Sequence, residues 1–197
     1  MKTTDHKIIS LAAVLLGAFL LYCLPWLFST ELVSPDDMIY DFFSGHLAQD
    51  GRIGYRPPGD ETWGREGFVP RYFVYSSAPG REGLSYPRKF PGFVLAWGAL
   101  RALVPGAGAL LFNPLCGALA IWLIYLVARS FHPDGPVPLL AAILAAVNPV
   151  LIHRTYMYNP TVFNLVLVLA VLVLLGRTLR RRSPWPFAAL GLSLIHI

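Results

Sequence analysis

The sequence predicts an all-α polytopic membrane protein with about four to five transmembrane helices and a large first extracytoplasmic loop containing juxtamembrane helices. Composition is the first reason: 55% of the 197 residues are hydrophobic and 14% are charged, whereas soluble domains carry roughly 25% charged residues. The second reason is that the apolar residues come in long uncharged blocks. About 20 such residues are enough for one helix to cross the hydrocarbon core.

The first uncharged block, residues 8–28, predicts an uncleaved transmembrane helix. It is longer than the roughly 7 to 15 apolar residues of a signal-peptide core, and no Ala-x-Ala-like site follows it. Further uncharged blocks predict the later spans: 102–128, 135–153, 155–176 and a fifth beginning at Trp185. The fifth block stops short of a full span, so we expect the chain to be the N-terminal part of a longer protein.

The third block is short for a span, and it contains Pro138 and Pro149, residues that kink or end helices. If every block crosses the membrane, one side receives most basic residues near the span ends: Lys2, Lys7, Arg129, Arg177, Arg180, Arg181 and Arg182. That side is predicted to be cytoplasmic.

This topology divides the chain into three parts. Residues 1–28 form the cytoplasmic N-terminus and the first transmembrane helix, 29–101 form an extracytoplasmic loop with juxtamembrane helices, and 102–197 contain transmembrane helices 2 to 5, the last truncated. The short loop after the third span, with His153 and Arg154, is expected on the outer side too. We predict a multi-pass protein of the plasma membrane.

Several classes of function are disfavoured. The isoelectric point near 9.4 results from the basic residues near the ends of the predicted spans. The sequence shows no basic stripe on a soluble face, which a nucleic-acid partner would require. Cys23 and Cys116 both fall inside predicted spans, so no disulfide framework is expected. The five histidines show no metal-ligand spacing. We therefore expect no metal and no cofactor.

Two adjacent carboxylates, Asp36 and Asp37, stand where the chain leaves the first predicted span. A structural explanation is available, because Ser34 can cap a helix, Pro35 suits its first position and Asp37 stands three residues after the cap. Carboxylates at a helix N-terminus contribute ~0.3 to 1 kcal/mol each.

The rest of this helix favours a functional explanation. One side carries Met38, Ile39, Phe42, Phe43 and Leu47, and the other carries Asp37, Tyr40, Asp41 and Ser44. This pattern predicts a helix lying in the membrane surface with its carboxylates beside lipid headgroups. Two acidic groups at such an anionic surface are costly, and a purely structural cap needs only Asn or Ser.

A cationic pair, Arg88 and Lys89, stands at the other end of the predicted outer loop. Pro91 and Gly92 follow it, and the next apolar stretch is too short to span before Arg101. We expect a second juxtamembrane helix here. Anchoring of the loop at the lipid interface by basic and aromatic side chains remains an equally good explanation of the pair.

The order of these parts resembles the GT-C superfamily of membrane glycosyltransferases, particularly dolichyl-phosphate-mannose protein mannosyltransferases and bacterial lipid A aminoarabinose transferases. The resemblance covers most of the chain and is carried by four stretches: D36-D37-M-I-Y40, R88-K89-F-P-G-F, L-I-Y-L-V-A-R-S-F, and L-A-A-I-L-A-A-V-N-P-V-L-I-H-R. The chain departs from the superfamily twice. It has Asp37 where Glu is usual, and Asn159 where many members carry Asp.

The resemblance implies transfer of a sugar from a polyprenyl-phosphate carrier to an acceptor hydroxyl at the outer membrane face, with inversion. The implied partners are this donor, a lipid, protein or glycan acceptor, and membrane lipids. Asp36 is the candidate general base. Asp37 is expected to orient the acceptor, tune the pKa of Asp36 or stabilise positive charge on the sugar ring. Arg88, Lys89 and Arg154 are candidates for binding the lipid phosphate, although a headgroup contact is the better explanation of Arg154. Tyr40 and Asn159 are candidates for binding substrate.

Three alternatives remain. A transporter or channel fragment is disfavoured because no span contains an internal ionisable residue, although Asn113-Pro114 and Asn148-Pro149 could each mark an unwound helix. A non-catalytic membrane subunit predicts that Asp36→Asn has no effect. An oligosaccharyltransferase-like enzyme shares the superfamily layout but relies on a metal, and Asn159 in place of Asp favours a metal-independent reaction.

Overall fold

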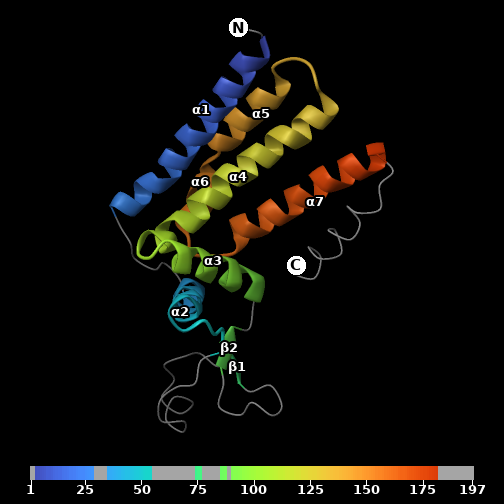
Figure 1. The fold of residues 1–197 in the computed structure, drawn as a ribbon. Helices are drawn as coiled ribbons and strands as arrows, with labels where there is room; N and C mark the ends of the chain where they lie inside the picture. Colours follow the sequence, from blue (N-terminus) through green and yellow to red (C-terminus); the bar gives the residue numbers. More distant parts are fainter. Residues whose placement is uncertain (1–2, 29–34, 55–73, 77–84, 88–89, 182–197) are drawn as a thin grey trace. The chain divides into compact units, whose positions relative to one another are not determined.

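The computed structural model describes residues 3–28, 35–54, 74–76, 85–87 and 90–181 (Figure 1). The chain divides into two compact units, one made of residues 1–30 with 113–197 and the other of residues 31–112. The described residues are mainly helical, which confirms the predicted all-α class. They also include one short antiparallel ribbon, in which β1 (Val74–Ser76) pairs with β2 (Ser85–Pro87).

The first unit is a bundle of apolar helices. It contains α1 (Thr3–Cys23), continued by the 3₁₀ turn η1 (Leu24–Leu27), and most of α4 (Ala107–Phe131), followed by α5, α6 and α7 (Thr161–Arg181). By length and composition, α1, α4 and α7 can each cross a membrane. The first, second and fourth predicted spans therefore correspond to helices of sufficient length.

The third predicted span is broken in two. Helix α5 (Val137–Ala146) and helix α6 (Pro149–Tyr156) meet at an angle of 51°. If the bent pair counts as one span, it is the fourth helix segment able to cross a membrane. The break lies at Asn148, whose Oδ1 accepts hydrogen bonds from the backbone N–H groups of Val150 (2.9 Å) and Leu151 (3.2 Å). Asn148 thus caps α6, with Pro149 at its first position.

Three boundaries differ from the prediction. His153 and Arg154 lie in the last turn of α6, whereas we expected them in a loop, so α7 begins only at Thr161. Pro138 lies in the first turn of α5 and does not bend it. Helix α4 runs through Asn113 and Pro114 without unwinding. The proposed fifth span from Trp185 lies outside the described residues.

Close packing in this bundle depends on a small residue of α4. A Cβ added at Gly117 would come within 2.6 Å of Thr155 Cγ2 on α6 and 2.7 Å of Tyr22 Cδ2 on α1. Tyr22 is buried, and its hydroxyl donates to the carbonyl oxygen of Ala146 at the end of α5 (3.1 Å). Small residues and interhelical hydrogen bonds of this kind hold membrane helices together.

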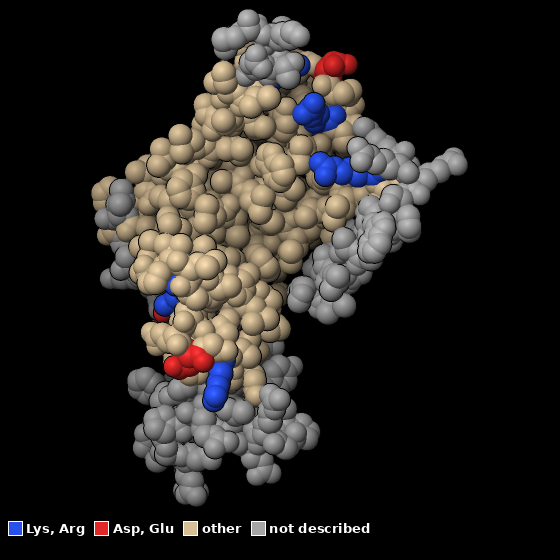
Figure 2. Space-filling view, viewed as in Figure 1, with Lys and Arg blue, Asp and Glu red and all other residues tan. Residues whose placement is uncertain are grey.

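Three basic residues of the first unit, Lys7, Arg129 and Arg177, lie toward one end of the bundle (Figure 1). Figure 1 shows the beginning of α1 and the last turns of α4 and α7 at the same end, and these parts carry Lys7, Arg129 and Arg177 respectively. Figure 2 shows Lys and Arg side chains gathered near this end. This placement agrees with alternating spans, and the cytoplasmic assignment of that end stays a prediction.

The second unit is built on α2 (Pro35–Asp50) and α3 (Pro91–Leu103), the helices expected at the two ends of the outer loop. They approach closely at Gly98 of α3, where an added Cβ would lie 2.6 Å from Leu47 Cδ2 and 3.0 Å from the Ser44 carbonyl oxygen. Helix α3 ends before Pro105 and Gly106, and α4 begins at Ala107. The second span therefore starts later than the predicted residue 102, because Gly106 adopts a left-handed conformation (φ +80°).

Candidate active site on helix α2

The acidic pair occupies the first turn of α2. The helix begins at Pro35, as predicted, whereas Ser34 and the side chain of Asp36 lie outside the described residues. Asp37 is 1% exposed, so the expectation that both carboxylates lie beside lipid headgroups is wrong for Asp37. Burial of a carboxylate within protein is costly unless other groups compensate for its lost hydration.

The polar side of α2 faces the protein, contrary to our interpretation of its two faces. Tyr40 and Ser44 are buried together with Asp37. The side expected to face lipid is divided, because Met38 and Phe42 are 58% and 42% exposed whereas Phe43 is 2% exposed. The polar side is buried because α3 covers it with suitable partners. The ring of Tyr40, for example, lies 5.3 Å from that of Phe93 in an edge-to-face arrangement.

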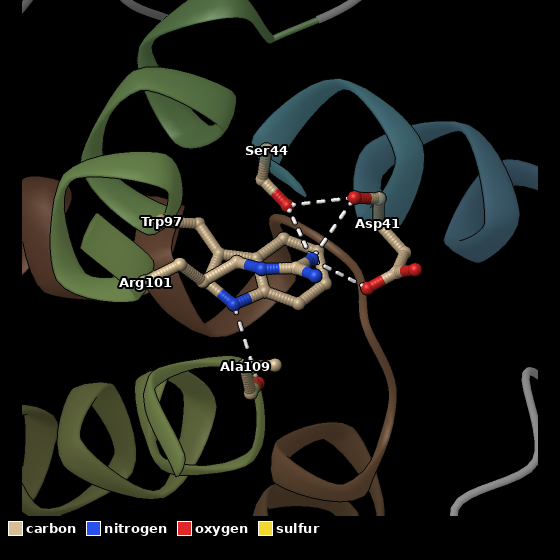
Figure 3. A network of polar contacts seen from close by, with 5 residues as sticks. All are labelled: Asp41, Ser44, Trp97, Arg101 and Ala109. Atoms are coloured by element: carbon tan, nitrogen blue, oxygen red, sulfur yellow. Dashed lines mark hydrogen bonds and ion pairs between the residues drawn. The ribbon is translucent and has the colours of Figure 1, made fainter. Parts of the chain in front are cut away.

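Arg101 of α3 is the principal polar partner of α2 (Figure 3). Its Nη1 donates to Asp41 Oδ1 (2.6 Å), to the Asp41 carbonyl oxygen (2.9 Å) and to Ser44 Oγ (3.0 Å). The guanidinium also lies 5.5 Å from the centre of the Trp97 ring, and Trp97 Nε1 donates to the Ala109 carbonyl oxygen (3.2 Å). From the sequence, Arg101 was expected only at the end of the outer loop. The available signal was the stripe of Asp37, Asp41 and Ser44 at helical spacing, which is satisfied either by water or by a polar partner such as an arginine.

The cationic pair, Arg88 and Lys89, lies outside the described residues, but both flanking residues are described. Pro87 is buried at the end of β2, and Phe90 has φ 50° and ψ 53°. A left-handed conformation is uncommon for a bulky residue, especially directly before a proline. The Phe90 carbonyl oxygen accepts from the N–H groups of Phe93 (3.0 Å) and Val94 (3.3 Å), which closes the first turn of α3. Strained residues of this kind concentrate at functional sites.

The remaining candidates, Arg154 and Asn159, belong to the other unit. Arg154 is exposed in the last turn of α6, with Nη1 3.7 Å from Met157 Sδ. Asn159 Oδ1 accepts from the backbone N–H of Thr161 (3.1 Å), so this side chain caps the start of α7. Of the predicted site residues, the structure brings together Asp37 and Tyr40, both buried on α2.

Sequence reasoning also missed the residues that hold the connection between α6 and α7. The ring of Trp26 lies 5.0 Å from that of Tyr156 and 4.6 Å from that of Tyr158. Asn113 Nδ2 donates to the carbonyl oxygen of Met157 between them. The connection that carries Asn159 is therefore fixed by an aromatic cluster and by a hydrogen bond from α4.

No metal site is formed by the part of the chain that the structure describes, since it contains no group of three His, Cys, Asp or Glu side chains able to hold an ion. Cys23 and Cys116 are both free.

A comparison with known families gives a match that covers more than half of the chain. The model of "Oligosaccharyl transferase STT3, N-terminal" matches residues 84–197, a range that includes Arg88, Lys89, Arg154 and Asn159 but not α2. No curated protein and no solved structure is significantly similar to the chain. The match confirms the GT-C superfamily, but it does not extend to the mannosyltransferase and aminoarabinose transferase branches. The chain belongs to the oligosaccharyl transferase STT3 family of GT-C membrane glycosyltransferases.

Proposed function

We propose that this protein transfers a sugar from a polyprenyl-phosphate carrier to an acceptor hydroxyl at the outer membrane face, with inversion at the anomeric carbon. Family membership supports glycosyl transfer from a lipid-linked donor within a membrane. The lipid tail of such a donor stays in the bilayer while its phosphate lies at the surface. The catalytic base and the phosphate-binding cations must therefore lie at the same depth.

The contact between Tyr40 and Phe93, with ring centres 5.3 Å apart, is the observation that carries the proposal. Asp36 precedes Tyr40 by one turn of α2, about 6 Å along the axis at ~1.5 Å per residue. Lys89 precedes Phe93 by four residues, which limits their separation to roughly 14 Å even for extended chain. Both charged pairs are thus tied by short stretches of chain to the same contact.

In the proposed reaction Asp36 takes the proton of the acceptor hydroxyl as the oxygen attacks the anomeric carbon. Such general base catalysis typically contributes about 10² to 10⁴ in rate. The buried carboxylate of Asp37 orients the acceptor or stabilises positive charge that develops on the sugar ring. Arg88 and Lys89 bind the departing lipid phosphate through charge-assisted hydrogen bonds, which stabilises it as a leaving group. Tyr40 supports the site from α2, and Arg154 is a further candidate for the phosphate.

The matched family favours a second candidate function, transfer of a whole oligosaccharide. The resemblance to oligosaccharyltransferase-like enzymes implies that this reaction relies on a metal. No step of our preferred reaction uses a metal, and Asn159 occupies the position where many superfamily members carry Asp. The two candidates differ in their dependence on a metal, which makes them easy to separate.

The test is a transfer assay with radiolabelled polyprenyl-phosphate sugars and membranes that contain the protein. Asp36→Asn keeps the size of the side chain and removes the base, so transfer is expected to fall by about 10² to 10⁴. The control is Asp134→Asn, an exposed aspartate in the connection between α4 and α5, which is expected to leave transfer unchanged.

The assay uses the full-length protein. Equal transfer by the wild type and Asp36→Asn would overturn the assignment of the base, and absence of transfer of either a single sugar or a lipid-linked oligosaccharide by the wild type would favour a transporter or a non-catalytic subunit. A parallel assay with a chelator separates the two enzymatic candidates. Our preferred reaction continues in the chelator, whereas the metal-dependent one stops and recovers when a divalent cation is added back.

A further inference from the structure

We propose that Arg101 is a positioning residue that fixes the rotation of α2 about its own axis and thereby decides which carboxylate of the acidic pair is free to act as the base. The inference rests on the proposed function, because it assigns a role toward the same acidic pair. It is drawn from contacts within the second unit alone.

First, the Arg101 side chain binds to α2 through several polar contacts. A single nitrogen, Nη1, contacts the Asp41 carboxylate (2.6 Å), the Asp41 carbonyl oxygen (2.9 Å) and the Ser44 hydroxyl (3.0 Å). The side chain is only 21% exposed, and an added Cβ at Gly45 would lie 3.1 Å from Nη2. Arg101 therefore fills a fitted place on α2, which an arginine that anchors to lipid headgroups does not need.

The second step is that this place lies on the same stripe of α2 as Asp37. Residues four apart on a helix lie one above the other, so Asp41 and Asp37 share one face. Consecutive residues differ by about 100° around the axis. With Asp41 held against α3, Asp37 is turned inward, where it is buried. The backbone of Asp36, one residue earlier in α2, is displaced from it by about 100° around the helix axis. A rotation of α2 by about one residue would exchange the two carboxylates.

The third step is that Arg101 itself is held in place from α3 and α4. The guanidinium lies 5.5 Å from the centre of the Trp97 ring, and Trp97 in turn donates a hydrogen bond to the Ala109 carbonyl oxygen (3.2 Å) (Figure 3). Trp97 is 1% exposed. Arg101 and Trp97, which we call the α3 clamp, thus connect α2 to α3 and to the start of α4. Because Trp97 is buried, α2 has little freedom to turn.

The experiment measures kcat for Arg101→Gln in two backgrounds, the wild type and Asp36→Asn. Each rate is divided by the number of protein molecules that bind the donor. In the wild-type background we expect a fall on the order of 10²-fold, because small displacements of a catalytic group have effects of this size, with an unchanged KM for the donor. In the Asp36→Asn background the same substitution is expected to change the residual rate little, since a residue that acts through the base has no further effect once the base is absent. Arg101→Lys, which keeps the charge, is expected to recover part of kcat.

The matched control is the other ion pair of α2, between His46 Nδ1 and Asp50 Oδ2 (2.7 Å). Both partners lie on α2, so Asp50→Asn removes an ion pair without releasing the helix from α3, and kcat is expected to stay at the wild-type value. If Arg101→Gln fails to reach the membrane, Asp41→Asn replaces it, because this variant keeps the arginine and removes its charged partner.

Two results would overturn the proposal: wild-type kcat in Arg101→Gln or Asp41→Asn, and an equal fold-decrease of kcat in both backgrounds, which describes a general structural role. The proposed function fails separately, when Asp36→Asn alone transfers sugar at the wild-type rate. The two failures are therefore distinguishable in one set of measurements.

Discussion

Phe90 is the described residue nearest to the cationic pair on the side of α3, and its backbone is left-handed (φ 50°). A conformation of this kind costs a non-glycine residue about 1 to 3 kcal/mol, and a β-branched residue tolerates it least. The surrounding structure supplies the compensation, since the Phe90 carbonyl oxygen accepts two backbone hydrogen bonds from α3. The turn at Phe90 therefore fixes the direction in which the chain enters α3.

We predict that Phe90→Gly unfolds at a higher temperature in detergent than Phe90→Val, by several degrees. Valine keeps more apolar surface than glycine, so only the left-handed backbone explains this order. The same two substitutions at Phe131, the last and exposed residue of α4, serve as the control and are expected to lack this order. Greater stability of Phe90→Val than of Phe90→Gly would show that the turn is not left-handed in the native protein.

The sequence predicted a helix that begins at the acidic pair, but it did not predict which part of the protein packs against that helix. The spacing of Asp37, Asp41 and Ser44 places them on one face. A helical pattern does not show whether lipid, water or another helix covers that face. Arg101, which is 60 residues from Asp41, provides the covering group, and only the packing of α2 on α3 reveals it.

Helices α2 and α3 are held together by close approach as well as by the ion pair. Gly98 of α3 lies against Leu47 and against the backbone of α2 at Ser44, and a Cβ there would lie 3.0 Å from the Ser44 carbonyl oxygen. Backbone yields less readily than a side-chain end, so the two helices must separate to admit a larger residue.

We predict that Gly98→Ala destabilises the protein by about 1 to 3 kcal/mol, measured as a lower melting temperature in detergent. The control is Gly17→Ala in α1, because an added Cβ there meets no atom within 4 Å. That variant is expected to be neutral or slightly more stable, since alanine favours a helix over glycine. A Gly98→Ala protein as stable as the wild type would contradict the close packing of α2 on α3.

Hydropathy located the long helices well but not their ends. The blocks that predicted α1, α4 and α7 are uncharged over enough residues to cross a bilayer. Their ends depend on local groups, such as the cap of Asn148, which divides the third block, and Gly106, which separates α3 from α4. Apolar composition alone does not mark such a break, because a broken pair and a straight span can be equally apolar. In the third block the Asn148-Pro149 pair did indicate the break, which the structure confirms at this place.

For the whole molecule, the two compact units carry different parts of the candidate machinery. The acidic pair and the α3 clamp belong to residues 31–112, whereas Arg154 and Asn159 belong to the helical bundle. The bundle places Lys7, Arg129 and Arg177 toward one end (Figure 1). If that end is cytoplasmic, as the distribution of basic residues predicts, then residues 29–101 face the outside.

The most direct test of this account is cross-linking of the acidic pair to the cationic pair from outside intact cells. The double variant Asp36→Cys/Lys89→Cys, in a Cys23→Ala/Cys116→Ala background, is treated with a short bifunctional thiol reagent that does not cross membranes. An otherwise identical variant with Asp134→Cys in place of Asp36→Cys is the control. We predict an intramolecular cross-link in intact cells for the first variant and none for the control. A cross-link that requires permeabilised cells, or none under either condition, would contradict the placement of both charged pairs together at the outer face.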